Sequence, residues 1–261
     1  VLCDPEGIDK EELTRLAHTR KMVKEFDTSK LSKQGFFVSV DDMDVMLPNG
    51  AIIANGTTFR NNFHTEIFKY VDHVDVFVPC GGRPNSINLN NLHCFIDEKT
   101  NKCKIPYIVE GANLFIAQPA KLALEAHGCV LFKDASANKG GVTSSSLEVL
   151  ASLALNDDDF VNKFVAKRET TPEGIKFIKS PLYKAYVVEA QSRIENNARL
   201  EFGQLWKINQ ETGTPISELS NVLSQTINKL NDELVESEEL WLNDLKLRNY
   251  LLLEKIIPKL L

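Results

Sequence analysis

Three short apolar runs, each followed by a loop rich in small polar residues, constrain the fold of this sequence most. The runs are Val74–Pro79, Ile105–Glu110 and Cys129–Lys133. Their hydrophobicity is continuous rather than alternating, which is typical of parallel strands covered on both faces. A helix is expected over Gln118–His127, with Pro119 in its first turn and Gly128 as its stop. Strand, helix and strand at this spacing predict a βαβ unit.

The segment before these strands is predicted to hold a helix and a β insertion. Apolar residues at helical spacing, with Asp9 and Glu12 as a capping box, predict a helix over Ile8–Phe26. Short β-prone runs follow between about residues 33 and 60, and Pro48-Asn49-Gly50 is a strong hairpin signal between two of them. Three further elements are expected: a turn at Asn55-Gly56, a helix around Asn62–Tyr70, and a small hairpin formed by Leu92–Ile96 and the turn Glu98–Asn101.

After Asn138 the pattern predicts helix nearly to the end of the chain. Leu147, Leu150, Ala151 and Ala154 share one face of the first of these helices. A second apolar stripe runs from Ile216 to Leu230, with Thr214 as the expected N-cap and Pro215 at the first helical position. The acidic stretch Asp232–Glu239 is interpreted as a solvated helix face.

Charge and residue counts exclude several functional classes. With 30 basic and 36 acidic residues the net charge is −6, so no broad cationic surface is expected for a nucleic acid. No run reaches the roughly 18 apolar residues of a membrane helix. The five cysteines lack C-x-x-C spacing and the five histidines lack metal-ligand spacing, so no metal site is predicted. Cys94 and Cys103 are expected as half-buried side chains in a reducing intracellular compartment, cytoplasmic or mitochondrial.

Candidate chemistry lies in the loops that follow the three predicted strands, because ligands of open α/β sheets bind beyond the carboxyl ends of the strands. These loops are Pro79–Asn85, Glu110–Asn113 and Asp134–Ser146. Glycine lets a flat ring approach the backbone, and an asparagine amide can bond a carboxamide or a ribose hydroxyl, which suits a nicotinamide. In the third loop, two glycines before a Ser/Thr cluster could present N–H groups and hydroxyls to a carboxylate. We expect the three loops to converge on one crevice.

A purely structural interpretation of the same residues stays open. Glycines and asparagines often serve turns, and serines at a helix start are commonly caps. Arg83 could bind an anion or be a paired surface arginine, and the histidines are interpreted as packing or surface residues. None of the 13 glycines forms the G-x-G-x-x-G turn that seats a pyrophosphate. Either the chain is not a dinucleotide-binding domain, or that turn lies in preceding sequence.

Long blocks of the sequence resemble the NAD-specific glutamate dehydrogenases of the large fungal type. The blocks are VPCGGRPNSI at residues 78–87, PYIVEGANLF at 106–115 and FKDASANKGGVTSSSLEVLASLAL at 132–155, with shorter ones at CDPEGID, LPNG and FRNNFH. The resemblance extends to about Phe202 and is weaker in the helical tail. It implies an α/β fold: a partial Rossmann-type doubly wound parallel sheet with a β-hairpin insertion and a helical C-terminal extension. The expected domains are residues 1–200, which bind the nucleotide, and residues 201–261, which form the extension.

The resemblance also implies roles for individual residues. Cys80 and Gly81 would line the nicotinamide side of an NAD site, and Asn113 would contact the nicotinamide ribose region. Asn138 would reach the nicotinamide and the edge of the substrate. Val142 and Ser145 would meet the glutamate side chain, with Ser145 hydrogen bonding its γ-carboxylate. Lys139 and Ser144 depart from the pattern of many relatives, which bears on the shape of this pocket.

The implied reaction converts L-glutamate, NAD and water to 2-oxoglutarate, ammonia and NADH in an enzyme expected to be a homo-oligomer. The catalytic lysine and aspartate, the pyrophosphate turn and the ribose-binding acid of the family belong to sequence before Val1, so this chain is expected to be a fragment that is inactive alone. A non-catalytic nucleotide-binding or regulatory module of the same fold is an alternative. Another is a related amino-acid dehydrogenase, in which an apolar residue would replace Ser145.

Overall fold

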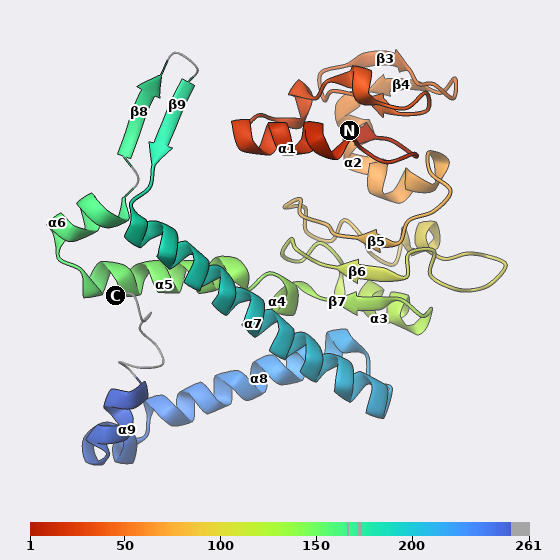
Figure 1. The fold of residues 1–261 in the computed structure, drawn as a ribbon. Coiled ribbons are helices and arrows are strands. Elements are labelled where there is room, and N and C mark those ends of the chain that lie inside the picture. The colour runs from red at the N-terminus through yellow and green to blue at the C-terminus, as the bar shows by residue number, and fades with distance from the viewer. Residues whose placement is uncertain (166, 172–173, 252–261) are drawn as a thin grey trace.

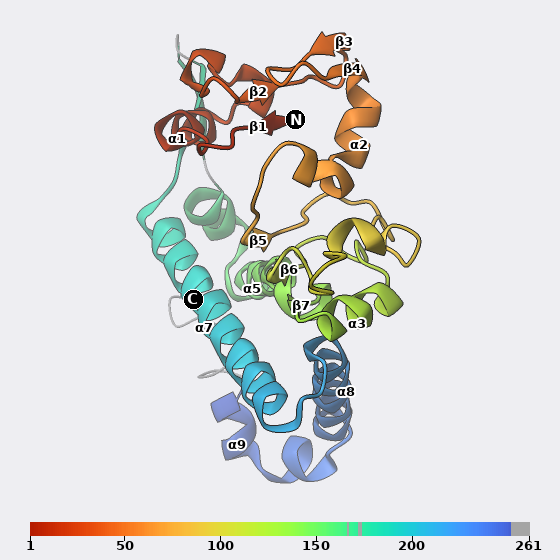
Figure 2. The same ribbon diagram turned by 90° about the vertical axis from the view of Figure 1, so that its right-hand side faces the viewer.

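The computed structural model describes residues 1–165, 167–171 and 174–251 (Figure 1). A small β and helical layer formed by the N-terminal residues lies beside a central parallel sheet, and long helices cross the other side of that sheet (Figure 2). The strands are β1 (Leu2–Cys3), β2 (Phe36–Phe37), β3 (Met43–Met46), β4 (Ile52–Asn55), β5 (Val76–Phe77), β6 (Tyr107–Val109), β7 (Val130–Phe132), β8 (Lys167–Thr171) and β9 (Gly174–Ile178). The helices are α1 (Lys10–Thr19), α2 (Gly56–Glu66), α3 (Gln118–Ala126), α4 (Asp134–Ala137), α5 (Gly140–Ala154), α6 (Asp157–Asp159), α7 (Pro181–Thr212), α8 (Ile216–Val235) and α9 (Leu245–Asn249).

Strands β5, β6 and β7 form the three-stranded parallel sheet that the apolar runs predict, in the order β5-β6-β7. Ile108 of β6 lies opposite Leu131 of β7, and both side chains are fully buried. Ala120 and Leu124 of α3 belong to the same core cluster, so this face of the sheet is covered by the crossover helix. The fold is therefore mixed α/β, with its main core between the sheet and α3.

The prediction that these strands are covered on both faces is wrong for β5 and β6. Val76 and Tyr107, which point to the face opposite α3, are each 50% exposed. On the neighbouring strand β7, Phe132 packs with Leu205 of α7 and Ile216 of α8. The helices after the sheet cover only the β7 side of this face, so continuous hydrophobicity correctly predicted parallel strands but not their coverage in this chain.

Helix α3 confirms the predicted βαβ unit in detail. Pro119 occupies its first turn, where a missing N–H costs nothing. Gly128 follows the helix with φ +86°, a left-handed conformation that glycine adopts without a Cβ penalty. These two local signals fixed both ends of the helix.

The N-terminal layer confirms the hairpin and shortens the first helix. Strands β3 and β4 pair antiparallel around Pro48-Asn49-Gly50. Asp9 caps α1 by accepting a hydrogen bond from Glu12 N–H at 2.7 Å. The helix ends at Thr19, because Arg20 has φ +53°, and only a short 3₁₀ turn over Val23–Glu25 follows.

Two expectations for the next segments are corrected. Asn55-Gly56 is a helix start rather than a turn: Asn55 Oδ1 accepts a hydrogen bond from Thr58 N–H at 2.8 Å, so α2 begins six residues before the expected Asn62. Leu92–Phe95 forms a 3₁₀ helix instead of a strand, and the expected hairpin is reduced to one bridge between Ile96 and Cys103.

The prediction of helix nearly throughout the chain after Asn138 is wrong for one segment, which forms a β-hairpin. Strands β8 and β9 pair antiparallel over five residue pairs and project between α6 and α7 (Figure 1). Helix α7 then runs without interruption through residues 200 and 201, the predicted domain boundary. The cap of α8 also differs, because Pro215 is the capping residue and Thr214 hydrogen bonds Thr212.

The apolar stripe on α8 is only half covered. Ile216 and Leu219 are buried against β7 and α7, whereas Val222, Ile227 and Leu230 are exposed. On α5, Leu147 and Ala151 are buried against α7 and Leu150 packs beside them, but Ala154 is exposed. Figure 1 shows α7 and α8 crossing near the turn that joins them and diverging away from it.

All five cysteines are free thiols, and Cys94 and Cys103 are half-buried as expected. Within the described ranges, no group of three or more His, Cys, Asp or Glu side chains could hold a metal ion. Across the same residues, none of the helices is both long and apolar enough to span a membrane.

Candidate functional site

The loops after β5 and β6 are in direct contact at the carboxyl edge of the sheet. Pro79 O accepts a hydrogen bond from Ala112 N–H at 2.7 Å. A Cβ atom placed on Gly111 would lie 2.9 Å from Cys80 Sγ and 3.3 Å from Pro79 O. Glycine at position 111 therefore lets the two loops approach as closely as they do.

The loop after β7 joins them through an amide pair. Asn138 Nδ2 donates hydrogen bonds to Asn113 Oδ1 at 2.5 Å and to Gly111 O at 3.3 Å. Cys80, Gly111, Asn113 and Asn138 thus form one group, which we call the strand-end cluster. Cys80 and Asn113 are exposed, and Gly81 is exposed beside Cys80. The structure thus brings together Cys80, Asn113 and Asn138, one candidate residue from each of the three loops.

Beneath the strand-end cluster lies an ion network that the sequence interpretation missed. Glu110, at the end of β6, is fully buried, and its carboxylate lies 2.6 Å from Lys121 Nζ of α3. The same carboxylate accepts hydrogen bonds from Ile116 N–H at 2.7 Å and Asp134 N–H at 3.0 Å. We call Glu110, Lys121 and Asp134 the ionic triad. The sequence feature that could have revealed this network is Lys121, a lysine on the otherwise apolar face of α3.

The ionic triad fixes the loop that carries Asn113. Asp134 Oδ2 accepts a hydrogen bond from Leu114 N–H at 2.8 Å, and Leu114 has a left-handed φ of +58°. Burial by itself would raise the pKa of Asp134, but the Leu114 hydrogen bond and the Lys121 charge lower it overall. Because a non-glycine residue is rarely left-handed, this bond helps hold Leu114, and with it Asn113, in place.

The start of α5 presents one hydroxyl differently from its neighbours. Thr143, Ser144 and Ser146 each donate their hydroxyl to a helix carbonyl, those of Lys139, Gly141 and Val142 respectively. Ser145 makes no such bond to any described residue and is exposed.

Val142 lies three residues before Ser145, on the same helix face, and is 72% exposed. An apolar contact and a free hydroxyl therefore share one side of α5. They lie within two turns of a helix N-terminus, whose unpaired N–H groups favour anions.

Three other singled-out residues have structural partners. Arg83 Nη1 donates to Asn61 O at 3.0 Å, which favours the paired interpretation over anion binding. Lys139 Nζ lies 2.7 Å from the Glu201 carboxylate of α7, so its charge is already paired. His64 packs edge-on against Phe115, and burial lowers its pKa, as expected of a packing histidine.

Comparisons with known proteins identify the family that this chain resembles. A model of the glutamate/leucine/phenylalanine/valine dehydrogenase family matches residues 1–213. The chain is 76% identical over its whole length to an NAD-specific glutamate dehydrogenase of Saccharomyces cerevisiae and 52% identical to one of Neurospora crassa, covering 23% of each relative. It is 49% identical over 92% of its length to glutamate dehydrogenase 2 of Dictyostelium discoideum, covering 22% of it. The chain thus spans less than a quarter of the relatives it matches.

Proposed function

Because this chain belongs to the glutamate/leucine/phenylalanine/valine dehydrogenase family, we propose that it forms the nicotinamide side of an NAD site and one wall of a glutamate pocket. The complete protein would oxidise L-glutamate with NAD and water to 2-oxoglutarate, ammonia and NADH. The names of the relatives, the strand-end cluster and the exposed Ser145 hydroxyl support this proposal together.

The proposal requires that a planar ring can approach the backbone beside the strand-end cluster. Added side-chain atoms at Gly81 would meet nothing closer than Arg83 Nε at 3.8 Å, so the backbone there is open to a ligand. Cys80 and Gly81 would line the nicotinamide side, while Asn113 would bond the ribose region. Asn138 would orient the carboxamide and the edge of the substrate through its amide. When bound, NAD supplies the hydride acceptor of the reaction.

Helix α5 would supply the wall of the glutamate pocket. The exposed Val142 side chain would pack against the substrate methylenes, and Ser145 would donate its hydroxyl to the γ-carboxylate. A hydrogen bond to an ionised acceptor is stronger than one between neutral groups. The preference for an acidic rather than an apolar side chain would therefore come from Ser145.

The observation that carries the proposal is the amide pair of Asn113 and Asn138, because it joins loops from two strands at one exposed edge. We also propose that the three-stranded sheet is part of a Rossmann-type doubly wound sheet. The complete enzyme would be a homo-oligomer.

The test is NAD binding by the complete protein, measured by calorimetry, together with glutamate-dependent NAD reduction. Gly81→Val should abolish NAD binding, because the new side chain fills the proposed nicotinamide side while the fold leaves room for it. Gly82→Val, at the next open position, is the matched control and should retain binding. Unchanged NAD affinity in Gly81→Val would contradict the cofactor role. NAD binding without glutamate oxidation would favour the non-catalytic module.

A further inference from the structure

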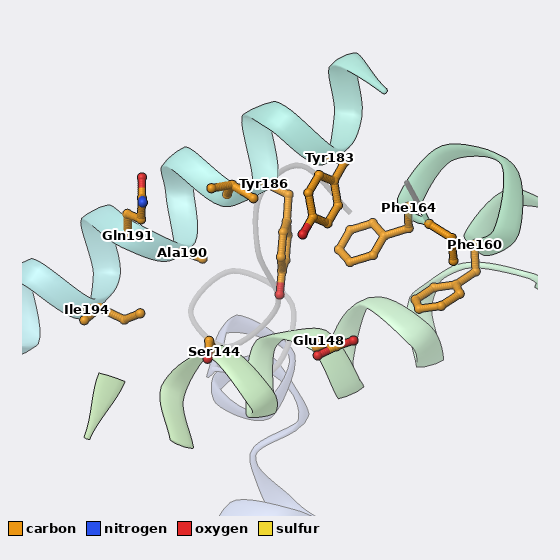
Figure 3. A pocket seen from close by; sticks show the side chains of 11 residues that line it. Ser144, Glu148, Phe160, Phe164, Tyr183, Tyr186, Ala190, Gln191 and Ile194 are labelled. Carbon is orange, nitrogen blue, oxygen red and sulfur yellow. The ribbon is translucent and has the colours of Figure 1, made fainter. Parts of the chain in front are cut away.

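A cavity separate from the strand-end cluster lies between α5, α7 and the π-helical turn Phe160–Phe164 (Figure 3). Its volume is about 410 Å³, within the range of small-molecule sites. Aromatic rings form much of its wall. Phe160 stacks on Phe164 with 5.3 Å between the ring centres, and Phe164 packs edge-on against Tyr186 with 4.5 Å between the ring centres. The wall is therefore suited to an apolar body of the size of one ring.

One polar atom in this wall lacks a partner. Tyr186 is only 6% exposed, and its hydroxyl has no hydrogen-bond partner among the described residues. In Figure 3 the Tyr186 hydroxyl points toward α5, between Ser144 and Glu148. A buried hydroxyl without a partner is unfavourable, so a ligand that bonds it would gain affinity.

The negative charge of Glu148 at the edge of the cavity favours a cationic ligand. Glu148 of α5 lines the cavity and is exposed, and within the described part of the chain no cation pairs with it. After burial, the charge of Glu148 is the largest influence that raises the pKa of Tyr186, which agrees with a carboxylate close to the hydroxyl. Tyr183 also lines the cavity, and Lys179 Nζ, from outside the lining residues, lies 5.3 Å from the centre of the Tyr183 ring. Carboxylate and ring faces both attract a cation.

We propose that this cavity binds a small organic cation, a primary ammonium on an apolar body, with the ammonium between Glu148 and the Tyr186 hydroxyl and the body against Phe160 and Phe164. The ammonium donates one hydrogen bond to the Glu148 carboxylate and one to the Tyr186 oxygen. Ser144 lines the cavity directly before Ser145, and Glu148 lies three residues after Ser145 on the same helix, so an occupant would contact α5 close to the proposed glutamate wall.

The experiment measures binding to the complete chain by calorimetry, without NAD or glutamate. The probe is phenethylammonium, and phenethyl alcohol and hydrocinnamate are a neutral and an anionic analogue with the same ring. We expect saturable binding of the ammonium at millimolar or lower concentration, with both analogues at least about tenfold weaker. Because neither substrate nor cofactor is present, the result is independent of the dehydrogenase proposal.

Two variants and two controls assign the site. Glu148→Gln and Tyr186→Phe should each weaken phenethylammonium binding, Glu148→Gln by about tenfold or more. Glu195→Gln on exposed α7 surface and Tyr107→Phe on the sheet should bind like the unaltered chain. Neither test variant should unfold the protein, because Glu148 is exposed and Tyr186→Phe removes an unpaired hydroxyl; circular dichroism checks this. Absence of saturable binding, equal binding of the neutral analogue, or unchanged affinity in both test variants would overturn the proposal.

Discussion

Lys121 Nζ lies 2.6 Å from the Glu110 carboxylate in the interior of the protein, where the two side chains are 3% and 0% exposed. This contact joins α3 to the carboxyl end of β6, and a second contact at 3.5 Å joins α3 to Asp134 after β7. A buried charge is tolerated only when its partner is present. The lysine therefore supports the backbone on which the strand-end cluster is built.

Lys121→Met should destabilise the protein by about 3–5 kcal/mol, because it leaves two carboxylates without their cation. Urea unfolding followed by circular dichroism measures the change. Lys229→Met is the matched control: Lys229 pairs with Glu233 on exposed α8 surface, and its loss should cost no more than about 1 kcal/mol. If the two variants had equal free energies of unfolding, the buried ionic triad would contribute no more to stability than an exposed ion pair.

Asn138→Asp in the complete protein should weaken NAD binding by about tenfold or more. The new carboxylate would face Gly111 O and Asn113 Oδ1, both acceptors, so the loops would separate instead of bonding. Calorimetric titration with NAD gives the dissociation constant. Asn196→Asp on exposed α7 adds the same charge away from the cluster and should leave the constant unchanged. If both variants bind NAD alike, the amide pair has no part in the cofactor site.

Ser145→Ala in the complete protein should raise the Michaelis constant for glutamate roughly ten- to hundredfold, with a smaller effect on NAD. The reason is the loss of one hydrogen bond to a charged group, about 1.5–3 kcal/mol. Ser146→Ala is the control, since that hydroxyl bonds Val142 O within the helix. Steady-state kinetics with each substrate varied separates the effects. An unchanged constant for glutamate would remove Ser145 from the substrate role.

Glu12→Gln should alter the acid stability of the N-terminal layer. Hydrogen bonds from the Arg15 guanidinium, and then from Asp27 N–H, lower the pKa of Glu12 from 4.5 to about 2. Since the folded pKa lies below the unfolded one, the carboxylate stabilises the fold above the unfolded pKa, and this stability is lost as the pH falls toward about 2.

The Glu12→Gln variant should therefore be less stable than the unaltered chain at neutral pH and lose less stability between pH 4.5 and about 2. Thermal unfolding across that range measures both effects. Glu11→Gln, on the exposed side of the same helix, should keep the original pH profile. Parallel profiles for Glu12→Gln and the unaltered chain would contradict the assignment.

Two glycine-to-alanine substitutions should change the free energy of unfolding in opposite directions. A Cβ on Gly56 would lie 1.8 Å from Ser39 O, so Gly56→Ala should destabilise the N-terminal layer by about 3 kcal/mol. Gly203, inside α7, has nothing within 4 Å of an added Cβ, so Gly203→Ala should stabilise by about 0.5–1 kcal/mol. Chemical denaturation of both variants provides the comparison, and a stable Gly56→Ala protein would be inconsistent with the packing at the start of α2.

Local chemistry explains which elements the sequence could predict. Pro119 and Gly128 set the ends of α3, and Pro48-Asn49-Gly50 set the β3–β4 hairpin, because their backbone preferences act within a few residues. Strand β8 contains no apolar residue, so the alternation expected of a strand is missing there and the sequence interpretation kept a helix. Arg20 ended α1 early through a left-handed conformation that no residue-type preference indicates.

By itself, the sequence determined that parallel strands exist and that each is followed by a loop of glycines, amides and hydroxyls. Tertiary structure decided that these loops touch: Val109 lies opposite Phe132 in the sheet register, which carries Asn113 and Asn138, 25 positions apart, to within a hydrogen bond of each other. The packing of α7 on α5 also forms the cavity, in which the Tyr186 hydroxyl has no partner among the described residues. The physical reason is that backbone preferences are local, whereas strand register and burial depend on packing between segments far apart in the chain.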